Sequence, residues 1–206
     1  MNKINYHKKM FEIIEKKQKE GVKPSLLLHS CCAPCSSHCI DLLKDYFNVT
    51  VFYYNPNISA EDEYIKRKNE QIRFIKEFAG DSVSFFEGEH DSRVFFDAVK
   101  GFEKCKEGFE RCFICYELRL FETAKKAKEL GFDYFCTTLT VSPLKNSEKL
   151  NEIGQKVSEK IGVEFLPSDF KKAEGYKHSI ELSKQYNLYR QNYCGCIFSK
   201  RGEKDD

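Results

Sequence analysis

The 206-residue sequence contains no tryptophan, two methionines and five prolines, and no stretch approaches the roughly 18 consecutive apolar residues of a membrane span. Residues 1–20 are charged and lack the apolar core of a signal peptide. With 34 Lys and Arg against 32 Asp and Glu, the net charge is +2, so the charge balance alone requires neither a nucleic acid nor a membrane as partner. We expect a cytoplasmic protein that does not bind membranes.

Three nucleotide-binding signatures are also missing. There is no G-x-G-x-x-G motif, so a nicotinamide or flavin site of the Rossmann type is unsupported, and there is no P-loop. The Ser-Gly-Gly-x-Asp-Ser loop of ATP-pyrophosphatases, which could follow the first predicted strand, is replaced by Ser-Cys-Cys-Ala-Pro-Cys at 30–35. Activation of a substrate by ATP is therefore not expected.

The apolar pattern predicts a single α/β domain. A composition of 41% hydrophobic and 14% aromatic residues argues against disorder, and the length suits one domain. Alternating strands and helices indicate a parallel sheet covered by helices on both faces, with a ligand site at the C-terminal strand ends. Strands are expected at 25–29, 49–54, 83–86, 132–138 and 163–166, and helices at 3–20, 33–46, 60–79, 91–100, 112–130, 146–161 and 174–187.

Cysteine is abundant, and nine of the ten cysteines fall into three groups. Closely spaced cysteines in a reducing compartment are more typical of metal binding or redox activity than of structural disulfides. The isolated Cys136 is predicted to be an ordinary buried thiol. The groups are Cys31, Cys32, Cys35 and Cys39; Cys105, Cys112 and Cys115; and Cys194 and Cys196.

The first two groups are suited to holding a metal. Thiolates are soft ligands for iron–sulfur clusters and for zinc. The adjacent Cys31 and Cys32 follow a strand, while Cys112 and Cys115 open a helix whose N-terminus favours thiolates. A structural zinc site built from Cys32, Cys35, Cys112 and Cys115 fits the spacing equally well.

The third group, Cys194-Gly195-Cys196, has a different character. With one residue between them, two sulfurs can close only a strained ring, and strained disulfides tend to be labile and oxidising. A cycling dithiol is one interpretation, and two further metal ligands are the other. The preceding Tyr189, Arg190 and Tyr193 interleave an arginine with aromatic rings, which suits phosphate contact and base stacking, although a solvated chain end would look similar.

Two polar segments outside the cysteine groups are candidate ligand-binding loops. One is a turn after the second strand, where side-chain amides could meet a ligand, and the other is a hydroxyl-rich loop with a lysine that opens a helix, an arrangement that binds anions. An ordinary turn and a helix-capping segment are the alternatives. The candidates are Tyr54, Asn55 and Asn57 in the first segment and Thr137, Thr138, Ser142 and Lys145 in the second.

Seven motifs in order extend the pattern over nearly the whole chain. They are HSCCAPC at 29–35, YNPNI at 54–58, EYIKR at 63–67, RCFICYELRLFETA at 111–124, GFDYFCTTLTVSPLK at 131–145, DFKKAEGY at 169–176 and LYRQNYCGC at 188–196. Together they resemble the QueH family of epoxyqueuosine reductases, formerly a domain of unknown function. The resemblance implies a Rossmann-like fold akin to the adenine-nucleotide α-hydrolase group. It makes 1–20 a helical extension and 21–206 one domain with a cysteine-bearing tail.

The resemblance also implies a reaction and its parts. The reaction is removal of the epoxide oxygen from epoxyqueuosine at the tRNA wobble position, the last step of queuosine synthesis, with electrons from an unidentified donor. A [4Fe–4S] cluster would be held by Cys31, Cys32, Cys112 and Cys115, with an additional iron close by. Cys194 and Cys196 would be the redox-active pair, and Tyr193 is our hypothesis for the proton donor.

Two other functions remain open beside this one. A cluster-dependent tRNA thiolase on a similar fold would need the ATP loop that the sequence lacks. A zinc-stabilised RNA-binding module without catalysis would use the same cysteines as structural ligands.

Overall fold

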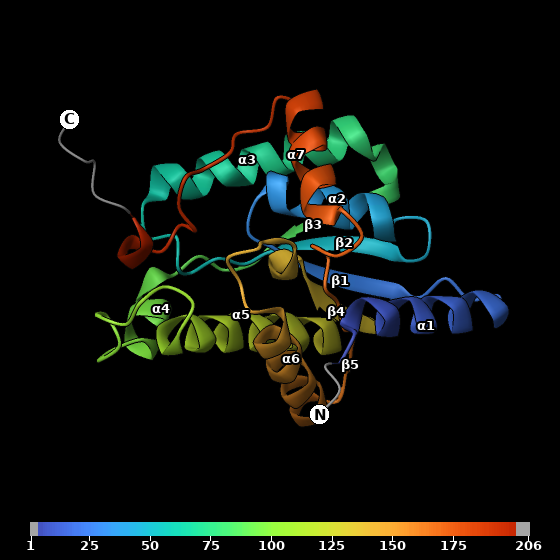
Figure 1. Ribbon diagram of the computed structural model, residues 1–206, viewed down its shortest axis with the longest axis horizontal. Coiled ribbons are helices and arrows are strands. Elements are labelled where there is room, and N and C mark those ends of the chain that lie inside the picture. Colours follow the sequence, from blue (N-terminus) through green and yellow to red (C-terminus); the bar gives the residue numbers. More distant parts are fainter. Residues whose placement is uncertain (1–3, 201–206) are drawn as a thin grey trace.

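A five-stranded parallel sheet forms the centre of the molecule, as the computed structural model shows for residues 4–200, the part of the chain that it describes (Figure 1). Its order is β3-β2-β1-β4-β5. Within it, Leu28 of β1 pairs with Val51 of β2 on one side and with Cys136 of β4 on the other. The strands are β1 (Ser25–Ser30), β2 (Asn48–Tyr53), β3 (Val83–Glu87), β4 (Tyr134–Thr137) and β5 (Glu164–Phe165). The predicted α/β class and parallel sheet are confirmed.

Seven α-helices surround the sheet in the described residues, each close to a predicted position. Helix α2 ends three residues earlier than expected because a turn closed by hydrogen bonds to the carbonyl of Leu43 follows it. Helix α5 begins two residues earlier, which places Cys112 in its first turn. The helices are α1 (Tyr6–Lys19), α2 (Ala33–Leu43), α3 (Glu61–Phe78), α4 (Ser92–Ala98), α5 (Glu110–Glu129), α6 (Ser147–Ile161) and α7 (Gly175–Gln185).

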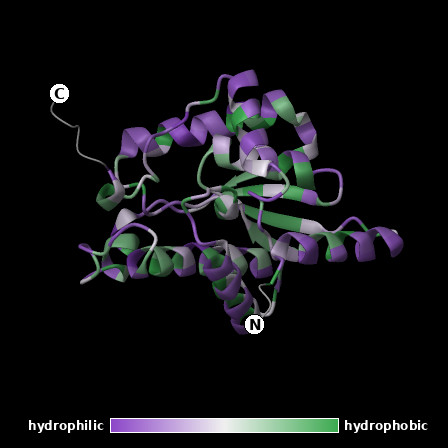
Figure 2. Cartoon of the chain, viewed as in Figure 1, coloured by the Kyte–Doolittle hydropathy of each residue, from purple (hydrophilic) through white to green (hydrophobic). Residues whose placement is uncertain are grey.

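Alternate residues of the strands pack against different helices. Because successive side chains of a strand point to opposite faces, Leu26 and Leu28 join one core cluster and Leu27 joins another. The first cluster includes residues of α1, α2 and α3, and the second includes residues of α5 and α6. Both faces of the sheet are therefore apolar, as the green colour of the strands shows (Figure 2).

Helix α1 is part of the first core cluster. Met10 and Ile14 are fully buried there, so the helix packs against the domain and does not project from it. The division of the sequence into an extension at 1–20 and a domain at 21–206 stays a prediction, and its outermost residues, 1–3 and 201–206, lie outside the described residues.

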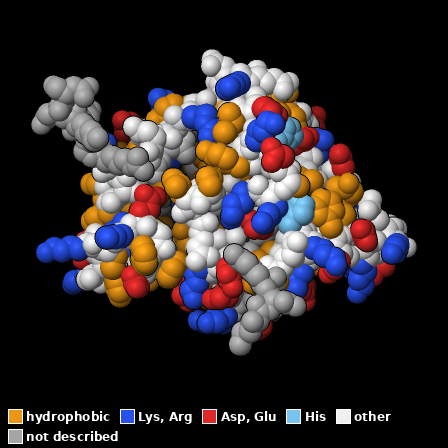
Figure 3. Space-filling view, in the orientation of Figure 1, with side chains coloured by type: hydrophobic (Ala, Val, Ile, Leu, Met, Phe, Trp, Pro, Cys, Tyr) orange, Lys and Arg blue, Asp and Glu red, His pale blue; other side chains and the backbone are white. Residues whose placement is uncertain are grey.

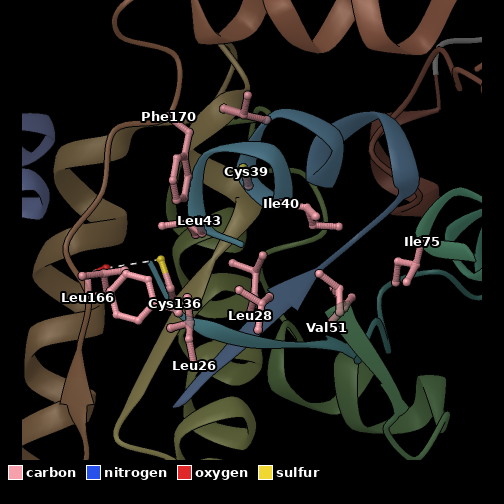
Figure 4. Packing of buried hydrophobic residues seen from close by; sticks show 14 of the residues in the cluster. Leu26, Leu28, Cys39, Ile40, Leu43, Val51, Ile75, Cys136, Leu166 and Phe170 are labelled. Carbon is pink, nitrogen blue, oxygen red and sulfur yellow. Dashed lines mark hydrogen bonds between the residues drawn. The ribbon is translucent and has the colours of Figure 1, made fainter. Parts of the chain in front are cut away.

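Cys136 lies in the same cluster, as the sequence predicts for an ordinary buried thiol. Its Sγ lies 3.2 Å from the carbonyl oxygen of Leu166, to which it donates a hydrogen bond (Figure 4). Cys39 is equally buried beside Ile40 and Leu43. Both cysteines serve as small packing groups.

The strand order reverses direction between β1 and β4, which are neighbours in the sheet although four α-helices, α2 to α5, separate them in sequence. In open parallel sheets the crevice at such a point, beyond the C-terminal strand ends, is the usual ligand site. Cys31 follows β1 there and Thr138 follows β4.

On the surface, acidic and basic side chains are intermingled over the face in view (Figure 3). Within residues 4–200, no helix is both long and apolar enough to cross a membrane.

Candidate functional site

Three thiols meet where β1 passes into α2. The sulfur atoms of Cys31, Cys32 and Cys35 all lie within 4.8 Å of one another, and those of Cys31 and Cys32 are 3.8 Å apart. Strand β1 ends at Ser30, and Cys32 is the extended N-cap residue of α2, with Pro34 in the first turn. The helix N-terminus favours negative charge on these sulfurs. This trio has the residue types and the spacing to hold a metal.

The other two predicted ligands lie in the first two turns of α5. The backbone N–H of Gly108 donates a hydrogen bond to Sγ of Cys112 over 3.1 Å. Cys112 packs against the core cluster that contains Cys31 and Cys32, whereas Cys115 packs with Cys196. Neither sulfur is a member of the 4.8 Å group.

Cys35 completes the trio, although it was not among the four predicted ligands. The signal for it was the Cys32-x2-Cys35 spacing, which the zinc alternative used. At the start of a helix, this spacing turns the two side chains toward the same side.

Hydrogen bonds among the three thiols shift their pKa values in different directions. Bonds from Cys32 and Cys35 hold the pKa of Cys31 well below its usual range. The same bond to Cys31 raises the pKa of Cys32 to about 12, and Cys35 is raised as well. One thiolate is thus stabilised by two neighbouring S–H groups, in a pocket that already favours anionic sulfur.

Two cations lie beside these sulfurs. Arg119 is buried in α5, and its Nε donates to the carbonyl of Cys115 over 3.2 Å. Burial acts against its charge, but the interactions with the sulfurs of Cys115 and Cys31 outweigh burial and raise the pKa of Arg119. For Lys145, burial likewise acts against the charge, and the thiolate of Cys194 raises its pKa above the usual range. Within residues 4–200 neither cation forms an ion pair with a carboxylate, so sulfur supplies the compensating charge.

The C-terminal tail brings the third cysteine group to the same place. Nε2 of Gln191 donates a hydrogen bond to Sγ of Cys32 over 3.0 Å. Cys194 Sγ lies 3.2 Å from Oγ of Ser199, while Cys196 is buried. A hydrogen bond from Cys196, followed by the charge of Lys145, holds the pKa of Cys194 well below its usual range. Cys194 is therefore the more nucleophilic sulfur of the pair.

A cavity of about 170 Å³ is lined by members of the thiol trio, by the two cations and by residues of the C-terminal tail. It opens at the C-terminal ends of β1 and β4, the place that the fold predicts for a ligand. Its wall includes Cys31, Cys35, Arg119, Lys145, Tyr193 and Cys194. Thiols from two segments far apart in the sequence thus face one space with two cations.

The predicted substrate-binding residues divide into two sets. Ser142, Lys145 and Arg190 line the cavity together with the predicted catalytic Tyr193. The remaining predicted residues do not line it: Tyr54, Asn55, Asn57, Thr137 and Thr138.

The second set supports the strand ends instead. Asn55 is fully buried, and its Nδ2 donates to the carbonyl of Ser30 over 2.9 Å. Oγ1 of Thr137 lies 2.9 Å from Nδ1 of the buried His29 and accepts from the backbone N–H of Leu139. Tyr54 lines a separate groove with Phe52. Asn57 and Thr138 are buried, each with one side-chain oxygen that has no hydrogen-bond partner in the described residues.

Arg119 and Gln191 are cavity residues that the sequence reasoning did not single out. Arg119 lies one helical turn after Cys115, within the 111–124 motif, and this i+4 spacing was the available signal. For Gln191, no local pattern distinguishes an amide that meets a thiol from one that meets water.

Comparison with known proteins agrees with this placement of the motifs. A family model described as epoxyqueuosine reductase QueH matches residues 26–202. The chain belongs to the epoxyqueuosine reductase QueH family. The matched residues include the five strands, apart from Ser25 at the start of β1, and all three cysteine groups, so the cavity lies wholly within the matched region.

Several QueH relatives match along most of their length. A protein of Streptococcus pyogenes serotype M1 is 42% identical over 202 residues, which cover 97% of this chain and 79% of that relative. A protein of Staphylococcus epidermidis is 43% identical over 96% of this chain and 85% of that relative. One of Thermotoga maritima is 39% identical over 87% of this chain and 93% of its own length. Each of these relatives is named epoxyqueuosine reductase QueH.

Proposed function

We propose that this chain reduces epoxyqueuosine to queuosine at the wobble position of tRNA, the last step of queuosine biosynthesis, in the cytoplasm. The observation that carries the proposal is the cavity lined by Cys31 and Cys35 of the thiol trio, by Lys145 and by Cys194. It occurs in a chain whose relatives bear the name of this reductase.

The residues of the site fit an iron–sulfur centre in their donor chemistry. Soft sulfur donors lie at two helix N-termini, and the buried Arg119 favours a net negative group beside them. We assign the [4Fe–4S] ligands to Cys31, Cys32, Cys112 and Cys115, and Cys35 is an available soft ligand for the additional iron. When bound, these groups would supply electrons and Lewis acidity toward the epoxide oxygen.

The dithiol matches the electron count of the reaction. Converting an epoxide to an alkene consumes two electrons and two protons and releases water. Oxidation of the Cys194 and Cys196 thiols to one disulfide releases two electrons and two protons, so one cycle of the pair balances one turnover. A reductant from another source, of the thiol or ferredoxin class, must then restore the dithiol.

Three side chains around the cavity have roles in binding and proton transfer. Burial, and then the charge of Glu63, raise the pKa of Tyr193, so its hydroxyl is protonated at neutral pH and can donate to the leaving oxygen. Arg190 lines the cavity with its Nη1 held 3.0 Å from Oγ of Ser183, a position suited to a phosphate. Lys145 places positive charge where negative charge develops on the oxygen.

The size of the cavity agrees with a substrate that enters only in part. At about 170 Å³ it is smaller than the few hundred Å³ that enclose a typical free ligand. We therefore expect the modified ring of the nucleoside to enter, while the rest of the anticodon loop stays outside.

The test is a reaction of the anaerobically purified protein with tRNA that carries epoxyqueuosine, followed by mass spectrometry of the nucleosides. We expect queuosine from the wild-type protein, and no conversion of the epoxide would overturn the proposal. A thiolated nucleoside in its place would identify the protein as a thiolase. In the Cys194→Ser and Cys196→Ser variants we expect multiple turnover to be lost; unchanged turnover would remove the dithiol role.

One observation favours a second candidate, a zinc-stabilised RNA-binding module. Three sulfurs within 4.8 Å fit a single tetrahedral ion, since zinc–sulfur bonds measure about 2.3 Å. Metal analysis of the anaerobic protein separates the two: a brown protein with roughly four or more irons per chain supports the reductase, and a colourless zinc protein supports the module.

A further inference from the structure

Arg67 is a buried charged side chain near the middle of α3. Its side chain is 1% exposed, and its Nε and Nη2 each lie 2.6 Å from Oε1 of Glu63, one turn earlier in the helix. A charge this deeply buried is destabilising unless its hydrogen-bond donors are paired. The remaining N–H groups of Arg67 therefore need hydrogen-bond acceptors, and these acceptors identify the segment that the ion pair contacts.

Those donors reach the loop that carries the dithiol. Nη1 donates to the carbonyl of Cys194 over 3.2 Å, and Nη2 donates to the carbonyl of Tyr193 over 3.4 Å. The guanidinium carbon also lies 5.2 Å from the centroid of the Tyr193 ring. One side chain thus contacts two consecutive peptide groups at the first cysteine of the pair.

The second oxygen of Glu63 extends the same contact. Oε2 accepts a hydrogen bond from the hydroxyl of Tyr189 over 3.0 Å. The tail after α7 runs beside α3 over this stretch (Figure 1). The ion pair is therefore a buried junction between the helix and the tail.

Gly195 lies in close contact with this junction. Its φ is +99°, a conformation that favours glycine, and a Cβ added there would be 2.6 Å from Cγ1 of Ile58 and 3.1 Å from Nη1 of Arg67. The residue between the two cysteines is thus pressed against the arginine. The position of the loop and the position of the guanidinium depend on each other.

The loop in turn determines where both sulfurs lie. Cys194 faces the cavity, while Cys196 is buried with Cys115 and Phe95. We propose that Arg67, fixed by Glu63, is the positioning residue of the dithiol and keeps the sulfur of Cys194 in the cavity. This rests on the proposed function only for what the dithiol does; Arg67 itself exchanges neither electrons nor protons.

The test measures the position of Cys194 without any substrate. The reduced protein, purified anaerobically, is treated with iodoacetamide, and the modification of each cysteine peptide is followed by mass spectrometry. In Arg67→Met we expect alkylation at Cys194 to be roughly tenfold faster, the effect of losing one charge-assisted hydrogen bond. Arg67→Lys should restore part of the protection because it keeps the charge.

Arg73 provides the matched control. It lies on the same helix, pairs with Glu70 at 2.9 Å, and donates to the tail carbonyls of Tyr186 and Asn187. Arg73→Met should leave alkylation at Cys194 unchanged. Equal acceleration in Arg67→Met and Arg73→Met would show general loosening of the tail and overturn the inference, as would wild-type labelling in Arg67→Met.

Cys136 reports global unfolding, since its thiol is buried in the core. If Arg67→Met exposes Cys136 as well, Glu63→Gln becomes the deciding variant, and we expect it to accelerate labelling at Cys194 alone; labelling at the wild-type rate would overturn the inference. The outcome is independent of the reaction. If the wild-type protein has no reductase activity but Arg67→Met still accelerates labelling at Cys194, the proposed function is wrong and the positioning role of Arg67 is supported.

Discussion

Gln191 donates a hydrogen bond from Nε2 to Sγ of Cys32, 3.0 Å away, and so joins the C-terminal tail to the end of the first strand. This single contact spans 159 positions of the sequence. It places a neutral N–H dipole beside a sulfur that we assign to the metal centre. Hydrogen bonds to ligand sulfurs are among the factors that set the reduction potential of such a centre.

In Gln191→Leu we expect the potential of the metal centre to fall. The amide dipole stabilises the added electron, so its removal disfavours reduction by roughly 40 mV, the equivalent of about 1 kcal/mol in a one-electron couple. An anaerobic redox titration of the visible absorbance measures this shift. Asn192→Leu is the control, because Asn192 also lines the cavity. A potential equal to that of the wild type in Gln191→Leu would contradict the prediction.

The assignment of the metal ligands predicts which cysteine variants lose the centre. Cys112→Ser should lose the visible absorbance and the bound iron, because it removes a soft donor at the site. Cys136→Ser should keep both, since the thiol of Cys136 is buried in the core and donates to the carbonyl of Leu166. Absorbance spectra and iron analysis of the two proteins give the answer. If both variants retain the centre, the ligand assignment is wrong.

The location of the site followed from the sequence because its signals are local. The apolar run before Cys31 predicts a buried strand, and the two cysteines at its end lie where a parallel sheet places its ligand. The start of α5 likewise put Cys112 and Cys115 at a helix N-terminus. These parts depend on residues close together in the chain.

The contacts that the sequence does not reveal depend on distant residues. The sequence predicts Asn55 as a ligand-binding amide at a strand end, and in the structure its Nδ2 donates to the carbonyl of Ser30 on the adjacent strand. Arg67 carries no local signal for its contact with the carbonyl of Cys194, which lies 127 positions away. Sequence periodicity describes the face of an element and carries no information about which remote backbone group will cover it.

The contact of Gly195 with Ile58 predicts a specific effect of adding a methyl group. Gly195 and Gly101 both have positive φ, +99° and +87°, so alanine is strained at either position. Only at Gly195 does the new Cβ meet neighbours; at Gly101 nothing lies within 4 Å. We expect Gly195→Ala to displace the tail and to accelerate tryptic cleavage after Arg190 several-fold relative to Gly101→Ala. Equal cleavage of the two variants would show that the contact does not hold the tail.

The contact of the buried His38 with His178, between α2 and α7, predicts a pH dependence of stability. Nδ1 of His38 lies 3.0 Å from Nδ1 of His178, whose Nε2 is 3.8 Å from Asp41. Burial, and then the charge of His178, lower the pKa of His38 from 6.5 to about 4, with His7 acting in the same direction and Asp41 against it. Between these two values the unfolded chain binds a proton at this position and the folded chain does not.

The free energy of unfolding should therefore fall as the pH drops from 6.5 toward 4, by up to roughly 1.4 kcal/mol per pH unit from this residue. Other groups titrate in the same range, so the difference between the wild type and His38→Gln isolates the contribution. Urea denaturation of both proteins at pH 7 and at pH 5 measures it. His38→Gln should be less destabilised, relative to the wild type, at pH 5 than at pH 7, because glutamine takes up no proton on unfolding. The same difference in unfolding free energy at both pH values would show that His38 keeps an ordinary proton affinity in the folded protein.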